Sequence, residues 1–234
     1  MMKRILFLTL LVVGMTQVQA AGIVVNDTIL GVPCRVYVPT SAHPVRYPVL
    51  YLHHGMYGNE TDWTEKGRLV PILDSLLALG EISEMVVVMP DNCPSKPTSE
   101  EEKAAATNGE WERQFAAFMS EAESRYPILS DPAHRAIAGL SMGGYHTMRV
   151  SHVLDGRFAY VGMFSPATFV HEYSPSAKLR WLAIGTDDFL YEDVKAYRLW
   201  LDDHAVTYHY YQSAGGHEWT NWQEYLVLFL KACK

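Results

Sequence analysis

Short apolar runs alternate with helix-periodic stretches along this chain, and the alternation constrains its fold more than any other feature of the sequence. Several runs, such as "MVVVMP", are continuously apolar, which is typical of parallel strands that are covered on both faces. The runs span residues 23–29, 34–39, 48–54, 85–90, 135–139, 159–164, 180–185 and 206–212. Apolar residues recur at helical spacing within 69–77, 111–122, 194–201 and 222–230. The sequence therefore predicts an α/β fold with a mostly parallel central sheet and helices on both faces.

The N-terminus has the pattern of a secretory signal peptide. Lys3 and Arg4 precede the apolar run "ILFLTLLVVGM" at residues 5–15, and "TQVQA" then ends at Ala20. An apolar run of this length is too short to span a bilayer as a helix, so we expect no membrane anchor. We expect cleavage after residue 20, a single catalytic domain over residues 21–234 and a secreted or periplasmic protein.

Charge and cysteine usage argue against several other classes of protein. The formal net charge of −7 is spread along the chain, apart from a local acidic cluster at residues 100–102, so we expect no nucleic-acid partner. Cys34, Cys93 and Cys233 do not have the spacing of a metal site or of a disulfide framework. They allow at most one intramolecular disulfide, and we interpret them as isolated small apolar residues.

Ser141 lies in "RAIAGLSMGGYH", where a GxSxG pattern follows a strand-like run and precedes a helix-like segment. The pattern is weak alone, but this position is the one that a nucleophile elbow occupies in an α/β-hydrolase sheet. The turn lifts the serine hydroxyl out of the sheet, and the following helix directs its N-terminal amides at the site. The backbone N–H of Met142 then becomes one donor of an oxyanion hole.

A serine hydroxyl needs a base that takes its proton and an acid that holds the base. In sheets of this type the chain order is Ser, then Asp or Glu, then His. Most later histidines fall in predicted helices or in a strand, as do His146, His152, His204 and His209. His217 lies in the turn "SAGGHEW" between the last strand and the last helix, so we predict that it is the base.

The acid should follow the strand before that histidine. "TDDFLYED" offers Asp187, Asp188, Glu192 and Asp193, of which the last two fall within the next helix. The spacing does not distinguish the two adjacent aspartates.

The second oxyanion donor should come from a loop after an early strand. "VLYLHHGMYGNETDW" fits, because His54 and Gly55 end a buried run and leave the backbone N–H of Met56 free to point into the site. His53 and His54 side by side also suggest a metal pair. Neighbouring side chains on a strand point to opposite faces, so joint ligation is disfavoured and we expect no metal. The predicted serine, histidine and aspartate chemistry requires no cofactor.

Five ordered segments together resemble the esterase D-like branch of the α/β hydrolases. They are "YPVLYLHHGMYGNETDW", "HRAIAGLSMGGYHTMRV", "RFAYVGMFSPA", "GTDDFLYE" and "SAGGHEW". That branch includes tributyrin esterases and the feruloyl and acetylxylan esterases of carbohydrate esterase family 1, and the match runs from about residue 25 to the end. The resemblance implies an α/β-hydrolase fold. It places the acid at the last residue of a GxxD motif, here Asp188, and the oxyanion amides at Met56 and Met142.

The chain departs from many of these relatives between residues 168 and 179, where only about a dozen residues replace a longer excursion over the site. We therefore expect a short cap region. The sequence predicts an exported serine carboxylesterase acting on short acyl esters, including acetyl or feruloyl groups on plant polysaccharides. An acyltransferase would use the same triad. A thioesterase of the S-formylglutathione hydrolase type is disfavoured by the export signal. A carbohydrate-binding protein without catalysis is disfavoured because every catalytic position is filled.

Overall fold

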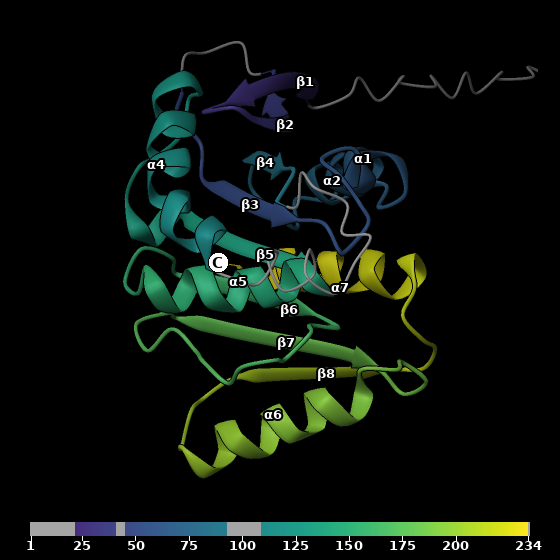
Figure 1. Cartoon of the computed structure of the whole chain (residues 1–234). Coiled ribbons are helices and arrows are strands. Elements are labelled where there is room, and N and C mark those ends of the chain that lie inside the picture. Colours follow the sequence, from purple (N-terminus) through teal and green to yellow (C-terminus); the bar gives the residue numbers. More distant parts are fainter. Residues whose placement is uncertain (1–21, 41–44, 93–108, 234) are drawn as a thin grey trace, which may run out of the picture.

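The computed structural model describes residues 22–40, 45–92 and 109–233, which build one eight-stranded sheet (Figure 1). The sheet order is β1-β2-β4-β3-β5-β6-β7-β8. The strands are β1 (Gly22–Ile29), β2 (Val32–Pro39), β3 (Val49–His53), β4 (Val86–Pro90), β5 (Arg135–Leu140), β6 (Tyr160–Phe164), β7 (Leu179–Gly185) and β8 (His209–Ser213). The predicted signal peptide at residues 1–20, the acidic cluster at 100–102 and Cys93 lie outside the described residues. Cys34 and Cys233 are free thiols.

The sheet is parallel from β4 through β8, and β2 pairs antiparallel with both β1 and β4. β1 and β2 form a hairpin whose turn residues, Leu30 and Gly31, both have positive φ. Two such residues match the right-handed twist of the paired strands. The strands β3, β4 and β5 are buried along their whole length, as their continuous apolar runs predicted. The predicted α/β fold with a mostly parallel sheet is confirmed.

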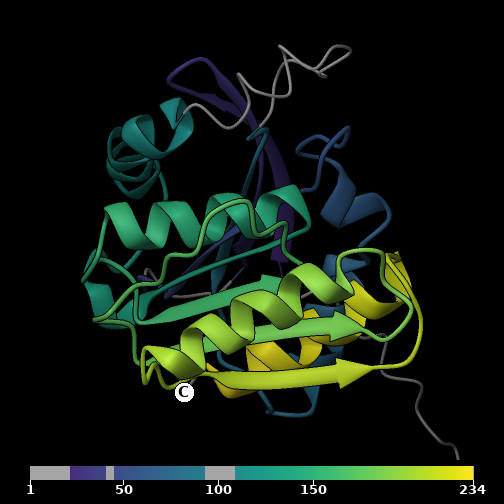
Figure 2. The ribbon, with the colours of Figure 1, turned by 60° about the horizontal axis from the view of Figure 1, so that its bottom comes forward.

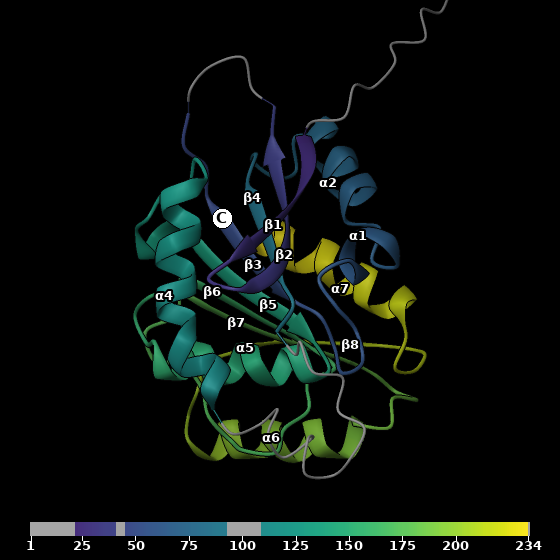
Figure 3. The same cartoon turned by 45° about the horizontal axis from the view of Figure 1, so that its top comes forward.

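Helices cover both faces of the sheet. The helices are α1 (Asp62–Glu65), α2 (Leu69–Ala78), α4 (Glu110–Arg125), α5 (Met142–Val153), α6 (Tyr191–Asp203) and α7 (Trp219–Ala232), and a 3-10 turn covers Pro132–His134. α1, α2 and α7 lie on one face, while α4, α5 and α6 lie on the other (Figures 2 and 3). Alternate strand residues divide between the faces, because Leu50 and Leu52 pack with α2 and α7 whereas Tyr51 packs against α4. Within the described residues, no helix has both the length and the apolar character needed to cross a membrane.

The last strand begins later than its apolar pattern predicts. β8 starts at His209 rather than near residue 206, because the chain first closes α6. Ala205 has a φ of 54°, and the N–H of Val206 donates to the carbonyl of Leu201. This bond satisfies a helix-end carbonyl, so Val206 belongs to the helix cap.

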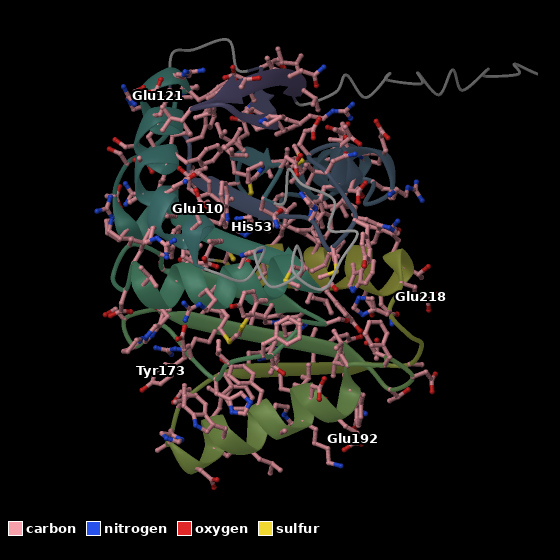
Figure 4. All side chains as sticks on the ribbon, in the orientation of Figure 1. His53, Glu110, Glu121, Tyr173, Glu192 and Glu218 are labelled. Carbon is pink, nitrogen blue, oxygen red and sulfur yellow. The ribbon has the colours of Figure 1, made fainter. Side chains whose placement is uncertain are left out.

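All the parallel strands end at one edge of the sheet, which lies on the right in Figure 1. The loops that follow β3, β5, β6, β7 and β8 therefore meet there. Glu192 and Glu218, labelled in Figure 4, mark the starts of α6 and α7 at this edge. In open α/β sheets ligands bind at this edge, so the fold predicts a functional site among these loops.

Candidate active site

Ser141 occupies a strained turn between β5 and α5. Its φ of 54° and ψ of −118° lie outside the regions that side-chain-bearing residues ordinarily adopt. The neighbouring chain holds this conformation from two sides. The Ser141 N–H donates to the carbonyl of Phe164 at 2.9 Å, and its own carbonyl accepts from Ala167 N–H at 3.0 Å. The residue is thus fixed between the end of β5 and the segment after β6.

Glycines permit the turn to approach its neighbours closely. A Cβ on Gly143 would lie 2.3 Å from the carbonyl oxygen of His54, and a Cβ on Gly139 would lie 2.4 Å from the carbonyl oxygen of Gly143. Both separations are far below van der Waals contact with backbone atoms that cannot move aside. The glycines around Ser141 are therefore required by packing, as the elbow prediction implies.

The three residues predicted as a triad form one hydrogen-bonded chain, although they are far apart in sequence. His217, between β8 and α7, places Nε2 2.9 Å from Ser141 Oγ. Its Nδ1 lies 3.0 Å and 2.9 Å from the two carboxylate oxygens of Asp188. With Nδ1 protonated and donating to the carboxylate, Nε2 is free to accept the serine proton.

The two adjacent aspartates diverge. Asp187 is exposed, whereas Asp188 is 4% exposed and also accepts a hydrogen bond from the N–H of Leu190 at 2.9 Å. Burial by itself raises the pKa of the Asp188 carboxyl. Hydrogen bonds donated by the His217 ring, a backbone amide and Ser165 outweigh that effect and hold this pKa below its usual value. The geometry therefore distinguishes Asp188, which is buried and contacts His217, from the exposed Asp187, although their spacing left the two equivalent.

Ser165 is part of this network, and sequence reasoning assigned it no role. It directly follows β6, is fully buried, has a φ of 44° and hydrogen-bonds to the carboxylate of Asp188. The indole N–H of Trp222 donates to Ser165 Oγ at 3.2 Å. The only sequence signal was its place in the "FSPA" segment, which contributed to the resemblance. Ser165 thus links a core indole to the carboxylate that holds His217.

The loop after β3 passes beside the serine. A Cβ on Gly55 would lie 3.3 Å from Ser141 Cβ and 2.6 Å from a Leu140 methyl carbon. Met56, the next residue, is half-buried and packs against the same apolar cluster as the buried Met142 side chain. The structure thus brings both predicted oxyanion residues to Ser141. Donation by their amides stays a prediction.

His53 and His54 have separate roles in the structure. His53 lies in the interior (Figure 4), where Nδ1 is 3.2 Å from Thr147 Oγ1 and Nε2 accepts from the Trp111 indole. Complete burial holds the pKa of His53 well below its usual range. His54 instead pairs with the carbonyl of Gly55 and with Asp91. Among the described residues, no group of three or more His, Cys, Asp and Glu side chains is placed to hold a metal ion.

A mostly parallel sheet that carries Ser141, Asp188 and His217 in this order, on loops at its carboxyl edge, defines an α/β hydrolase. The family model described as "Putative esterase" matches residues 31–232. The chain belongs to this esterase family, a family of carboxylic ester hydrolases.

Curated relatives of this chain have enzymatic names. An endo-1,4-beta-xylanase/feruloyl esterase of Xylanibacter ruminicola is 31% identical over 152 residues, which are 61% of this chain and 20% of the relative. An acetyl esterase of Caldicellulosiruptor saccharolyticus is 24% identical over 227 residues, covering 76% of this chain and 80% of the relative. The chain thus spans about a fifth of the length of the first relative and most of the second.

Solved structures share the fold. A ferulic acid esterase superimposes with a TM-score of 0.77 at 24% identity and covers 91% of this chain and 98% of its own. A ferulic acid esterase from Anaeromyces mucronatus, in complex with ferulic acid, gives a TM-score of 0.72 at 20% identity and covers 91% and 89%. These likenesses agree with the α/β-hydrolase architecture.

Removing the Ser165 hydroxyl should impair the site while leaving the fold. We expect Ser165→Ala to lower kcat on p-nitrophenyl acetate by about tenfold, since a hydrogen bond to a charged group contributes about 1.5–3 kcal/mol. Loss of this hydrogen bond should also raise the pKa of the Asp188 carboxyl toward its usual value, so the loss of activity at low pH should begin at a higher pH. A pH–rate profile measures both effects.

Ser151→Ala is the matched control. Ser151 is equally buried but donates to the carbonyl of Met148 within its own helix, away from Asp188. Equal losses of activity in the two variants, or an unchanged pH profile for Ser165→Ala, would show that Ser165 serves only packing.

Proposed function

We propose that this chain is an exported serine carboxylesterase that hydrolyses short-chain acyl esters through an acyl-enzyme. The observation that carries the proposal is the hydrogen-bonded chain from Asp188 through His217 to Ser141. In its support, the serine stands on a strained turn at the N-terminus of α5. An alkyl hydroxyl needs a positioned base and an oriented acid for nucleophilic attack, and this hydrogen-bonded chain supports these roles for His217 and Asp188.

In the first half of the proposed reaction, His217 Nε2 takes the proton of Ser141 as Oγ attacks the ester carbonyl. The carbonyl oxygen becomes an oxyanion and receives hydrogen bonds from the backbone amides of Met56 and Met142. The amide end of α5 adds a favourable partial charge at the same place. Asp188 stabilises the imidazolium and keeps its proton on Nδ1.

The tetrahedral intermediate then collapses. The bond from the former carbonyl carbon to the alcohol oxygen breaks, and His217 returns its proton to that oxygen. Water enters, His217 takes one of its protons, and the hydroxide attacks the acyl-serine. A second collapse releases the carboxylic acid and restores the Ser141 hydroxyl.

The connection between β6 and β7 supports a preference for short acyl groups. Its residues are fixed against the neighbouring helices, because Arg149 of α5 pairs with Glu172 and Tyr197 of α6 donates to the Glu172 carbonyl. His152 of α5 also hydrogen-bonds to the Tyr173 carbonyl. Each buried CH₂ adds about 0.8 kcal/mol of binding. A short connection held in this way offers little apolar wall for a long acyl chain.

The names of the relatives guide the choice of natural ester. One is called an acetyl esterase and another a xylanase/feruloyl esterase. We propose acetyl or feruloyl groups on plant polysaccharides or oligosaccharides as the substrates. Export through the segment at residues 1–20 would bring the enzyme to such polymers, in the periplasm or outside the cell.

Removing either proton-transfer partner should abolish most of the activity. Ser141→Ala and His217→Ala should each lower kcat on p-nitrophenyl acetate by about 10⁴-fold or more, and the double variant should lose little beyond either. Steady-state kinetics of the three variants measure this. Multiplicative losses in the double variant would contradict a shared step.

The adjacent aspartates provide a matched pair. Asp188→Asn should lower kcat by about 10³ to 10⁴, because the amide would favour the wrong tautomer of His217. Asp187→Asn should cost less than about tenfold, since an exposed carboxylate contributes only a screened field. The opposite ranking would make Asp187 the acid.

Acyl length should affect the rate strongly. We expect kcat/KM to be highest on p-nitrophenyl acetate or butyrate and to fall on the octanoate and palmitate, for lack of apolar wall. A maximum at octanoate or beyond would overturn the short-acyl proposal. Acetate release from acetylated xylan tests the carbohydrate proposal separately.

A further inference from the structure

Large aromatic side chains are exposed at the edge of the sheet that carries the candidate active site. Among the described residues, the largely exposed aromatic side chains are Tyr57, Phe169 and Phe189, at 56%, 64% and 75%. They lie on the loops after β3, β6 and β7, and each loop also carries a residue that contacts or neighbours the triad. Single exposed apolar residues are common on proteins, so exposure alone assigns none of these three rings to a binding site.

Phe189 is the one of the three that touches the triad. Its ring lies 4.5 Å from the His217 ring, measured between centroids, at an interplanar angle of 51°. The Trp222 ring lies 4.8 Å from the same imidazole at 87° and is buried. The imidazole therefore contacts two aromatic rings, the buried indole of Trp222 and the exposed phenyl ring of Phe189.

The chemistry of ester cleavage determines which part of a substrate lies beside Phe189. The departing alcohol oxygen must come within hydrogen-bond reach of His217 Nε2 to receive the proton. The carbonyl oxygen lies instead at the amides of Met56 and Met142. The group attached to the alcohol oxygen therefore starts beside the imidazole, the ring that the exposed Phe189 side chain contacts.

The surroundings of Phe189 favour a neutral polyhydroxylated ring as that group. An aromatic face attracts the C–H side of a sugar ring through apolar contact and its negative quadrupole. Asp187 and Glu218, the neighbours of the triad acid and base in sequence, are exposed carboxylates that can accept hydrogen bonds from hydroxyl groups. They would repel an anionic alcohol. Phe189 thus offers a stacking face, and Asp187 and Glu218 offer acceptors for hydroxyl groups.

We infer that Phe189 is the stacking platform of an alcohol-side subsite that binds the sugar ring carrying the ester. The inference rests on the proposed esterase function and adds a residue and a substrate class to it. Phe189 determines specificity for the leaving alcohol, while the acyl group is bound on the other side of Ser141.

Two acetate esters that differ only in their alcohol test the subsite. We expect Phe189→Leu, which keeps an apolar side chain on His217, to lower the ratio of kcat/KM on acetylated xylotriose to that on ethyl acetate by about tenfold, mainly through KM. Phe189→Trp should keep the ratio. Phe169→Leu is the matched control, because Phe169 is a similarly exposed ring that packs against Tyr145 rather than His217, and it should leave the ratio unchanged.

The outcomes separate the inference from the function. If Phe189→Leu lowers both kcat/KM values equally, or neither, Phe189 is no sugar platform. The inference also fails if Phe169→Leu changes the ratio as strongly. A wild-type enzyme that cleaves ethyl acetate but not acetylated xylotriose overturns the subsite and leaves the esterase intact. Absence of activity on both esters overturns the proposed function itself, and the subsite with it.

Discussion

The backbone at Ser141 is the constraint on which the site depends. A residue with a side chain is held there at positive φ between two strands' ends, by bonds to Phe164 and Ala167. The turn fits only because Gly143 lies directly against the carbonyl of His54. Such strain persists where the surrounding structure over-determines it, and here a fully buried β5 and its neighbours do so. The cost of the strained turn is met by the stability of the sheet.

The parallel sheet brings the other two residues of the site to this strained serine. Because its strands end at the same edge, Asp188 and His217 reach Ser141 from loops that are distant in sequence. Asp188 takes hydrogen bonds from His217, Leu190 and Ser165, and these keep the pKa of its carboxyl low despite its burial. A carboxylate held in this way stays charged beside the imidazole, which orients the ring.

Buried histidines near the site serve the scaffold. His53 joins β3 to α4 and α5 through Trp111 and Thr147, and His146 of α5 pairs with Glu112 of α4. The aromatic environment of His217 differs, since its ring contacts both the buried Trp222 and the exposed Phe189. The contact with buried Trp222 helps to hold the imidazole in position, and the contact with exposed Phe189 places it next to an accessible surface.

The sequence by itself determined the α/β class, the approximate limits of the strands and helices, and the loops that bear Ser141 and His217. Hydrophobic period and turn residues act locally, so a single chain displays them. Spacing left Asp187 and Asp188 equivalent, and only the resemblance to a family selected between them. Tertiary structure decided which of the two aspartates is buried, and it placed Ser165 and Phe189 beside the triad. It also decided that β8 begins only after the residues that cap α6. These features depend on contacts between segments far apart in the chain, and no local pattern records such contacts.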